Sequence, residues 1–136
     1  MARRRTIDEL LESARDQIER LTPEAAKAAM DAGDVLIDTR CQESRQQMGV
    51  VPDSIHVPLS VLYWRVGRAG DGIDPRISNP ACRLVLLCAH GYSSSLAAAT
   101  LRDLGFDGAT DVIGGFEGWQ AAGLPVEPLV HAGAAR

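Results

Sequence analysis

The sequence predicts an α/β fold in which a mainly parallel central sheet is flanked by helices on both faces. Short apolar runs alternate along the chain with segments whose apolar residues recur at helical spacing, and short turns join them. The run from Leu84 to Leu87 is apolar at every position, as is typical of a strand covered on both faces. The length of 136 residues suits one domain, and a content of 46% hydrophobic and 24% charged residues is that of a globular protein.

Residues 1–20 are expected to form an amphipathic helical extension. Apolar residues recur at helical spacing from Ile7 to Leu21, with charged residues between them. Thr6 and Glu9 have the spacing of a capping box, in which each side chain accepts from the other residue's backbone N–H. The pattern leaves open whether this helix packs on the domain or pairs with a partner.

Residues 21–128 are expected to form the domain, and residues 129–136 a flexible tail. Thr22, Pro23 and Glu24 supply the cap, the first helical residue and a first-turn acid of a helix that should end near Asp31. The elements expected after it are a strand at 35–38, a short helix to about 48 with a capping box from Thr39 to Gln42, a strand at 54–57, a loop at 67–80, the strand at 84–87, a helix from about 93 to Gly105, a strand at 110–113 and a short helix carrying Phe116 and Trp119.

Charge and cysteine usage exclude several classes of protein. The net charge of −4 gives no electrostatic reason to bind nucleic acid. No apolar run approaches the ~20 residues of a membrane helix, and no signal peptide is evident, so we expect no membrane partner and a cytoplasmic location. Three cysteines without Cys-x-x-Cys spacing, and three scattered histidines, argue against a disulfide framework and a metal site. We expect neither metal nor cofactor.

Cys88 is the candidate nucleophile because it follows the buried strand, at the sheet edge where ligands of parallel sheets bind. A six-residue turn into a helix aims backbone N–H groups and the helix dipole at one point, which should lower the pKa of a thiol there. Gly91 allows the positive φ that such a cradle needs. The polar run from Ser93 to Ser95 favours a helix start that faces a pocket. Position alone also fits a buried cysteine acting as a small hydrophobe.

Four blocks of sequence resemble the rhodanese family, in order and with matching spacing. Residues 87–93 are similar to its active-site loop, residues 36–40 to its Asp-x-Arg strand end, residues 51–58 to its Ile-Pro-Gly-Ala-x-x-x-Pro segment, and residues 114–126 to its C-terminal signature. Together the blocks cover about residues 20 to 127 and imply a rhodanese-like fold.

The resemblance implies a single-domain sulfurtransferase that moves sulfane sulfur through a persulfide on Cys88. The donor would be a small sulfur-containing anion such as thiosulfate or a persulfide, and the acceptor a thiol or cyanide. No cofactor is implied, and the chain could be a monomer or a homodimer. The substrate-binding residues would be those of the loop: Ala89, His90, Gly91, Tyr92 and Ser93.

Departures from the family pattern qualify this expectation. Many members carry arginine where this chain has Ser93, so we expect thiosulfate to bind weakly; a protonated His90 could compensate, or it could be a plain surface histidine. Related phosphatases use a loop one residue longer that ends in arginine, and this chain has Ser94 there, which argues against a phosphatase. The alternative function is a rhodanese-like module that binds partners or senses persulfides without turnover.

Three charged residues are candidates for a supporting role around the loop. Asp38 and Arg40 either lie near the site or form a local ion pair, and Arg65 falls in a segment that could face the pocket or solvent. Cys41 is a second thiol that could relay sulfur. Phe116 and Trp119 are expected in the core rather than at a ligand.

Overall fold

The computed structural model describes residues 3–68 and 74–129. Four strands, β1 (Val35–Asp38), β2 (Ile55–His56), β3 (Leu84–Leu87) and β4 (Thr110–Asp111), form one parallel sheet in the order β2-β1-β3-β4. Strands β1 and β3 are paired over their whole length, so that Asp38 and Leu87 end them side by side. The predicted parallel α/β fold is confirmed, while residues 130–136 of the predicted tail lie outside the described residues.

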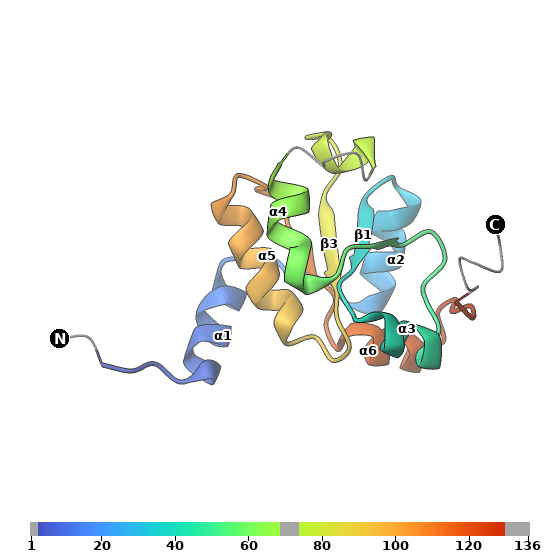
Figure 1. The fold of residues 1–136 in the computed structure, drawn as a ribbon, viewed down its shortest axis with the longest axis horizontal. Helices are drawn as coiled ribbons and strands as arrows, with labels where there is room; N and C mark the ends of the chain where they lie inside the picture. The colour runs from blue at the N-terminus through green and yellow to red at the C-terminus, as the bar shows by residue number, and fades with distance from the viewer. Residues whose placement is uncertain (1–2, 69–73, 130–136) are drawn as a thin grey trace.

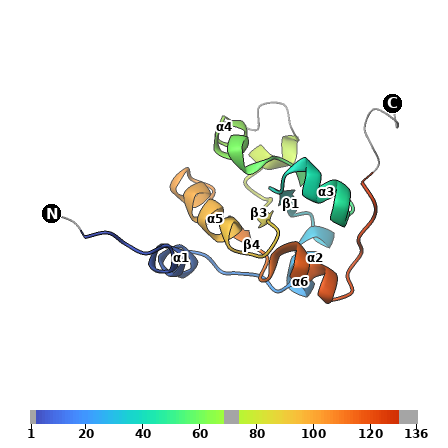
Figure 2. The ribbon, with the colours of Figure 1, turned by 60° about the horizontal axis from the view of Figure 1, so that its bottom comes forward.

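Helices cover both faces of the sheet (Figures 1 and 2). Helices α4 (Leu62–Gly67) and α5 (Ser93–Asp103) lie on one face, and α2 (Pro23–Asp31) and α6 (Gly115–Ala121) on the other. The short α3 (Gln42–Met48) follows β1 at the carboxyl edge.

Strand side chains alternate between two apolar clusters, as the period of two requires. Ile37 and Leu86 pack toward α4 and α5, while Leu36 and Val85 pack toward α2 and α6. Each such fully buried aliphatic side chain contributes about 1.5–3 kcal/mol to folding. This burial on both faces explains why the run from Leu84 to Leu87 has no polar residue.

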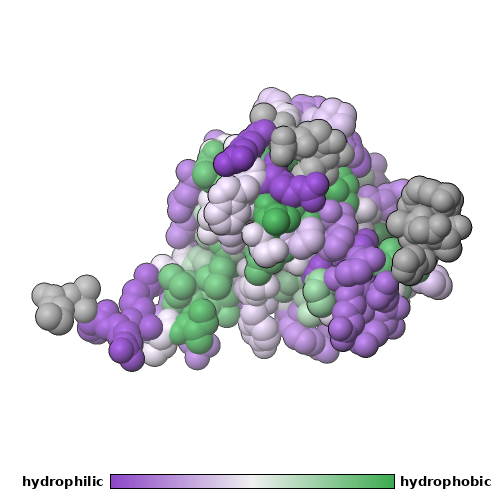
Figure 3. Space-filling model, in the orientation of Figure 1, coloured by the Kyte–Doolittle hydropathy of each residue, from purple (hydrophilic) through white to green (hydrophobic). Residues whose placement is uncertain are grey.

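The N-terminal helix α1 (Ile7–Asp16) packs against α5 with Ala14 buried. Its predicted capping box is confirmed: the Glu9 N–H donates to Thr6 Oγ1 at 3.1 Å, and the Thr6 N–H donates to Glu9 Oε1 at 2.9 Å. Ile7 and Leu10 stay exposed. Figure 3 shows hydrophobic surface at the lower left, on the side of the molecule where α1 lies. The extension therefore packs on the domain, with an apolar outer face left open.

Two details differ from the sequence prediction. The capping box expected from Thr39 is wrong: Cys41 is the N-cap of α3, and the Thr39 hydroxyl donates to the Leu87 carbonyl because Thr39 is still held at the sheet edge. Helix α4 was not expected; Leu62 and Val66, four residues apart, bury one side of it.

The remaining differences are of length. The strands expected at 54–57 and 110–113 are two residues each, and the expected loop at 67–80 contains a 3-10 turn at Pro75–Ser78. Among the described helices, none has the length and apolar character that crossing a membrane requires.

Candidate active site

Cys88 is the first residue after β3 and is 5% exposed. The Gly91 N–H donates to its Sγ at 3.1 Å, and Ser94 Oγ lies 3.2 Å from the same sulfur. Residues 88–92 join the buried strand to α5, whose first residue is Ser93. The expected cradle is therefore present, with the Gly91 N–H and the Ser94 hydroxyl within hydrogen-bond distance of the sulfur.

The pKa of the Cys88 thiol lies below its ordinary value. Burial alone raises it, but the Ser94 and Ser93 hydroxyls and the N–H groups of Ser94 and Gly91 together lower it by more. The positive end of the α5 dipole acts in the same direction. These neighbours are typical of a reactive thiol rather than of an inert core cysteine, so Cys88 remains the candidate nucleophile.

The loop is held on its other side by the start of α6. The Phe116 N–H donates to the Cys88 carbonyl at 2.8 Å, and the Glu117 N–H to the Ala89 carbonyl at 3.1 Å. Gly91 has φ +86°, and a Cβ there would lie 2.8 Å from the Gly114 nitrogen. Loop and helix are thus in backbone contact, and only glycine fits at position 91.

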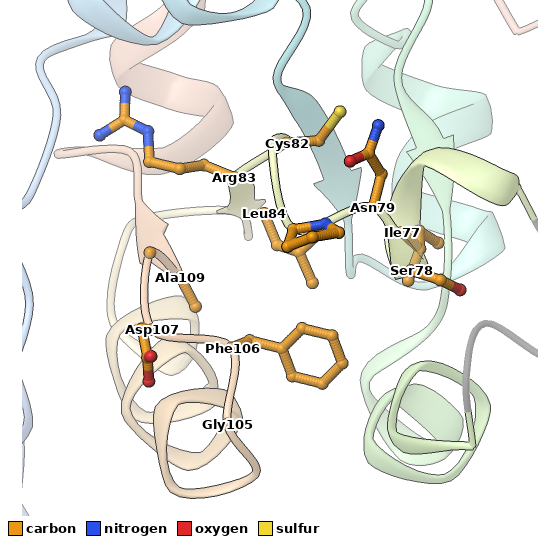
Figure 4. Close-up of a pocket in the computed structure, with 12 residues that line it drawn as sticks. Ile77, Ser78, Asn79, Cys82, Arg83, Leu84, Gly105, Phe106, Asp107 and Ala109 are labelled. Atoms are coloured by element: carbon orange, nitrogen blue, oxygen red, sulfur yellow. The ribbon is translucent and has the colours of Figure 1, made fainter.

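A hollow of about 370 Å³ lies beside the loop. Its lining comes from the end of β1, α3, the loop and α6: Arg40, Ser44, Gln47, Met48, Ala89, His90, Phe116, Glu117 and Gln120. The cavity drawn in Figure 4, about 260 Å³, lies at the opposite end of the sheet, where Leu84 begins β3 and Ala109 precedes β4. Of these two, the hollow at the loop is the one on the Cys88 side of the sheet: it is lined by Ala89 and His90, the two residues after Cys88, although not by Cys88 itself.

The five loop residues predicted to bind substrate have different surroundings. Ala89 and His90 line the hollow, and His90 Nδ1 is 3.5 Å from Glu117 Oε2. Gly91 contributes its N–H to Cys88. Tyr92 is 62% exposed with the Arg15 guanidinium over its ring, and Ser93 begins α5. Of the five, the structure brings Ala89 and His90 to the hollow.

Asp38 and Arg40 form the local ion pair that the sequence left open, and Arg40 also reaches the hollow. Arg40 Nε and Nη2 donate to the two Asp38 oxygens at 3.0 and 2.8 Å, and Arg45 Nε donates to Asp38 at 3.2 Å. The Arg40 guanidinium stacks on the Phe116 ring at 3.9 Å, and its Nη1 is buried without a hydrogen-bond partner. One carboxylate faces two guanidinium groups, so this cluster keeps an excess of positive charge next to the hollow.

Among the described residues, the other candidates make no hydrogen bond to the Cys88 sulfur. Arg65 is exposed on α4 and, within the described part of the chain, makes no hydrogen bond or ion pair. Cys41 is exposed, with its Sγ 3.3 Å from Ser44 Oγ. Phe116 and Trp119 are buried, as expected of core residues. Over residues 3–68 and 74–129, no group of three or more acidic, histidine or cysteine side chains is placed to hold a metal ion.

Sequence reasoning missed a buried polar cluster behind the loop. Asp111, at the end of β4, is fully buried and accepts from the hydroxyls of Ser94 and Ser95 at 2.7 and 2.8 Å and from Arg20 Nε at 2.9 Å. The serines therefore face Asp111 and not a pocket, contrary to expectation. In the sequence, the one feature that could have indicated this cluster was an acidic residue, Asp111, within a predicted strand. Nothing in the sequence indicated that Arg20 would lie beside it.

Comparison with known proteins places the chain in a family. The rhodanese-like domain matches residues 22–122. The thiosulfate sulfurtransferase GlpE of Pseudomonas savastanoi pv. phaseolicola is 35% identical over 105 residues, which are 77% of this chain and 90% of that protein.

Solved structures agree on the fold. A Rhodopseudomonas palustris CGA009 protein of unknown function, described as a possible tyrosine phosphatase, is 30% identical with a TM-score of 0.81, and the match covers 93% of this chain and 98% of the other. The polysulfide-sulfur transferase homodimer of Wolinella succinogenes is 24% identical with a TM-score of 0.71, covering 90% and 88%. The chain therefore belongs to the rhodanese-like domain family, as a rhodanese-like sulfurtransferase.

Proposed function

We propose that this chain transfers sulfane sulfur from a donor such as thiosulfate to a thiol or cyanide acceptor through a persulfide on Cys88. The observation that carries the proposal is the position of the Cys88 sulfur, at the carboxyl end of β3 between the Gly91 N–H and the Ser94 hydroxyl. These groups favour an anionic sulfur, whether thiolate or persulfide.

The reaction has two half-reactions. The Cys88 thiolate attacks the outer sulfur of thiosulfate, the sulfur–sulfur bond of the donor breaks, and sulfite leaves with the bonding electron pair. An acceptor thiolate or cyanide then attacks the outer sulfur of the persulfide, and the Cys88 thiolate leaves. Neither step needs an external oxidant, because the sulfur is transferred at its own oxidation level.

The charge around the hollow gives an anionic donor limited support, because Glu117 places a carboxylate on the same lining as Arg40. Arg40 lines the hollow with its Nη1 unpaired, and it belongs to the cluster that keeps excess positive charge. The Arg40 side chain is only 3% exposed, so its guanidinium would act on a donor sulfonate in the hollow through its electric field rather than by direct contact. Thiosulfate is still proposed to be a weak donor, because Arg40 is already shared with Asp38.

The three free cysteines fit a reducing compartment, so we also propose the cytoplasm as the location. A phosphatase is not supported, even though one structural relative is described as a possible tyrosine phosphatase. Position 94 holds a serine bound to Asp111, where a phosphate would require a guanidinium fork.

Intact-mass measurement tests the proposal. The protein is incubated with thiosulfate, or with a cysteine desulfurase and cysteine, and should gain the mass of one sulfur atom. Cys88→Ser should gain none, while the matched controls Cys41→Ser and Cys82→Ser should gain it as the wild type does. If the wild type gains no sulfur from either donor, the proposal of sulfur transfer is refuted. If Cys88→Ser gains as much sulfur as the wild type, the assignment of Cys88 as the sulfur-carrying residue is refuted.

A second step separates turnover from sensing. Cyanide or a small thiol is added to the sulfur-loaded protein, and thiocyanate or the new persulfide is quantified. Discharge followed by reloading supports the enzyme. A persulfide that forms on Cys88 but is never discharged would instead support the non-turnover sensing module.

A further inference from the structure

The buried carboxylate of Asp111 connects Cys88 to the N-terminal segment. Ser94 Oγ donates to Asp111 Oδ2 at 2.7 Å and lies 3.2 Å from Cys88 Sγ. Arg20 holds the same carboxylate with two bonds, from Nε to Oδ1 at 2.9 Å and from Nη2 to Oδ2 at 3.2 Å. Thiol, hydroxyl, carboxylate and guanidinium thus form one continuous chain.

A second path reaches Cys88 through Gly91. Nη2 of Arg15 and Nη2 of Arg20 both donate to the Gly91 carbonyl, at 2.8 and 3.0 Å. The N–H of Gly91 itself donates to Cys88 Sγ at 3.1 Å. Two guanidinium groups therefore fix the residue that carries the backbone donor of the thiol. Both arginines precede the part of the chain, residues 22–122, that the family match covers.

These arginines supply positive charge that the loop lacks. Within residues 88–93 the only side chain that can become cationic is His90, and it faces Glu117. The charged groups on the elements packed around the Cys88 loop are as follows. The N-terminal segment carries Arg15 and Arg20, and β1 ends at Asp38, followed by Arg40 and by Arg45 on α3. The loop carries His90, β4 carries Asp111 and α6 carries Glu117.

The hydroxyl of Ser94 has one proton and two competing acceptors. In the structure it donates to Asp111, and an ionised Cys88 would need the same proton. Arg20 neutralises Asp111 and so weakens the competition of that carboxylate. Without Arg20, an unpaired buried carboxylate would keep the proton and place a negative charge close to the thiolate. A like charge at this range disfavours ionisation.

We propose that Arg20 and Asp111 are positioning residues that control the ionisation of Cys88 through Ser94, while Arg15 holds Gly91 in place. The inference rests on Cys88 being the nucleophile of the proposed function. It gives the N-terminal segment a part in the active site, beyond its packing on α5.

The test is the pH dependence of Cys88 alkylation by iodoacetamide, in a single-cysteine background made by Cys41→Ser and Cys82→Ser. Arg20→Met should raise the pH of half-maximal rate by about one unit, which is about tenfold less thiolate at lower pH. Arg20→Lys, which keeps the charge, should return part of this shift. The double variant R20M/D111N, which also removes the unpaired carboxylate, should bring the midpoint back toward the background value.

Arg102→Met is the matched control, because Arg102 Nε also donates to a backbone carbonyl, that of Ala109 at 2.8 Å, away from the loop. It should lower the unfolding temperature and leave the alkylation midpoint unchanged. The inference is overturned if Arg20→Met behaves in the same way, or if Asp111→Asn fails to restore the midpoint of Arg20→Met.

If Arg20→Met does not fold, Asp111→Asn alone decides. Removing the competing carboxylate should lower the midpoint, and an unchanged midpoint would overturn the inference. Alkylation needs no sulfur donor, so this result is independent of sulfur transfer. If the protein takes up no sulfur, the proposed function is refuted, but the alkylation result would still show whether Arg20 and Asp111 control the ionisation of Cys88.

Discussion

Gly115→Ala should displace the loop that carries Cys88, because residue 115 on α6 packs directly against the loop backbone. Gly115 has φ +61°, and a Cβ there would lie 2.5 Å from the Cys88 carbonyl oxygen, 2.7 Å from the Gly91 nitrogen and 2.8 Å from the Ala89 carbonyl carbon. All three are backbone atoms, so no side-chain rotation can relieve the contact. Loop and α6 must move apart, which weakens the Phe116 N–H bond to the Cys88 carbonyl.

The expected loss of stability has two parts. An L-residue in the left-handed region costs about 1–2 kcal/mol, and forcing an extra methyl into a packed site costs about 1–3 kcal/mol. Gly123→Ala is the matched control: Gly123 follows the same helix with φ +73°, and a Cβ there would meet nothing within 4 Å. Gly123→Ala should therefore carry only the first cost, and Gly115→Ala both.

Urea unfolding followed by tryptophan fluorescence measures the difference, since Trp119 is fully buried. Gly115→Ala should be less stable than Gly123→Ala by about 1–3 kcal/mol, and its Cys88 should alkylate more slowly at neutral pH because the donors at the sulfur have moved. Equal losses of stability in the two variants would refute the backbone contact as the cause.

Three further predictions concern charge and titration. Asp38→Asn should cost about 3–5 kcal/mol in urea unfolding because it leaves the buried Arg40 uncompensated, whereas Asp74→Asn, in an exposed pair, should cost less than about 1 kcal/mol; equal losses would contradict this. Ser93→Arg should lower the KM for thiosulfate in steady-state assays, and an unchanged KM would count against a missing loop cation. Because its pKa is lowered, Cys88 in the single-cysteine background should alkylate with a midpoint below that of a free cysteine peptide measured alongside it. The rate should fall as the pH falls through that midpoint, and a midpoint at or above the free value would show that burial dominates.

The central fold could be predicted because its determinants are local. Leu84 to Leu87 are apolar at every position, which requires cover on both faces, and the two clusters supply it. Thr6 and Glu9 are three residues apart, so their spacing in the sequence was enough to predict the capping box. The same reasoning failed for Thr39, whose hydroxyl bonds to Leu87, 48 residues away, instead of capping the next helix.

Within the candidate active site, the sequence by itself pointed to Cys88 as the candidate nucleophile and predicted the shape of its loop. A cysteine directly after a buried strand, with Gly91 three residues later and a helix next, can form a cradle from its own backbone. Such contacts span few residues, and the Gly91 donor to Cys88 was found where the pattern predicted it. The hydroxyl at the sulfur belongs to Ser94, one residue past the predicted loop.

Only the tertiary structure decided what surrounds that loop. Arg15 and Arg20 donate hydrogen bonds to Gly91, from which they are separated by 76 and 71 residues in the sequence. Arg20 also donates to Asp111, which is 91 residues away. The spacing of residues along the chain does not encode which strand lies beside which, nor where α1 packs. These contacts follow from the parallel order of the strands, which brings the end of β4 beside the end of β3 and makes room there for two arginines from the N-terminal segment.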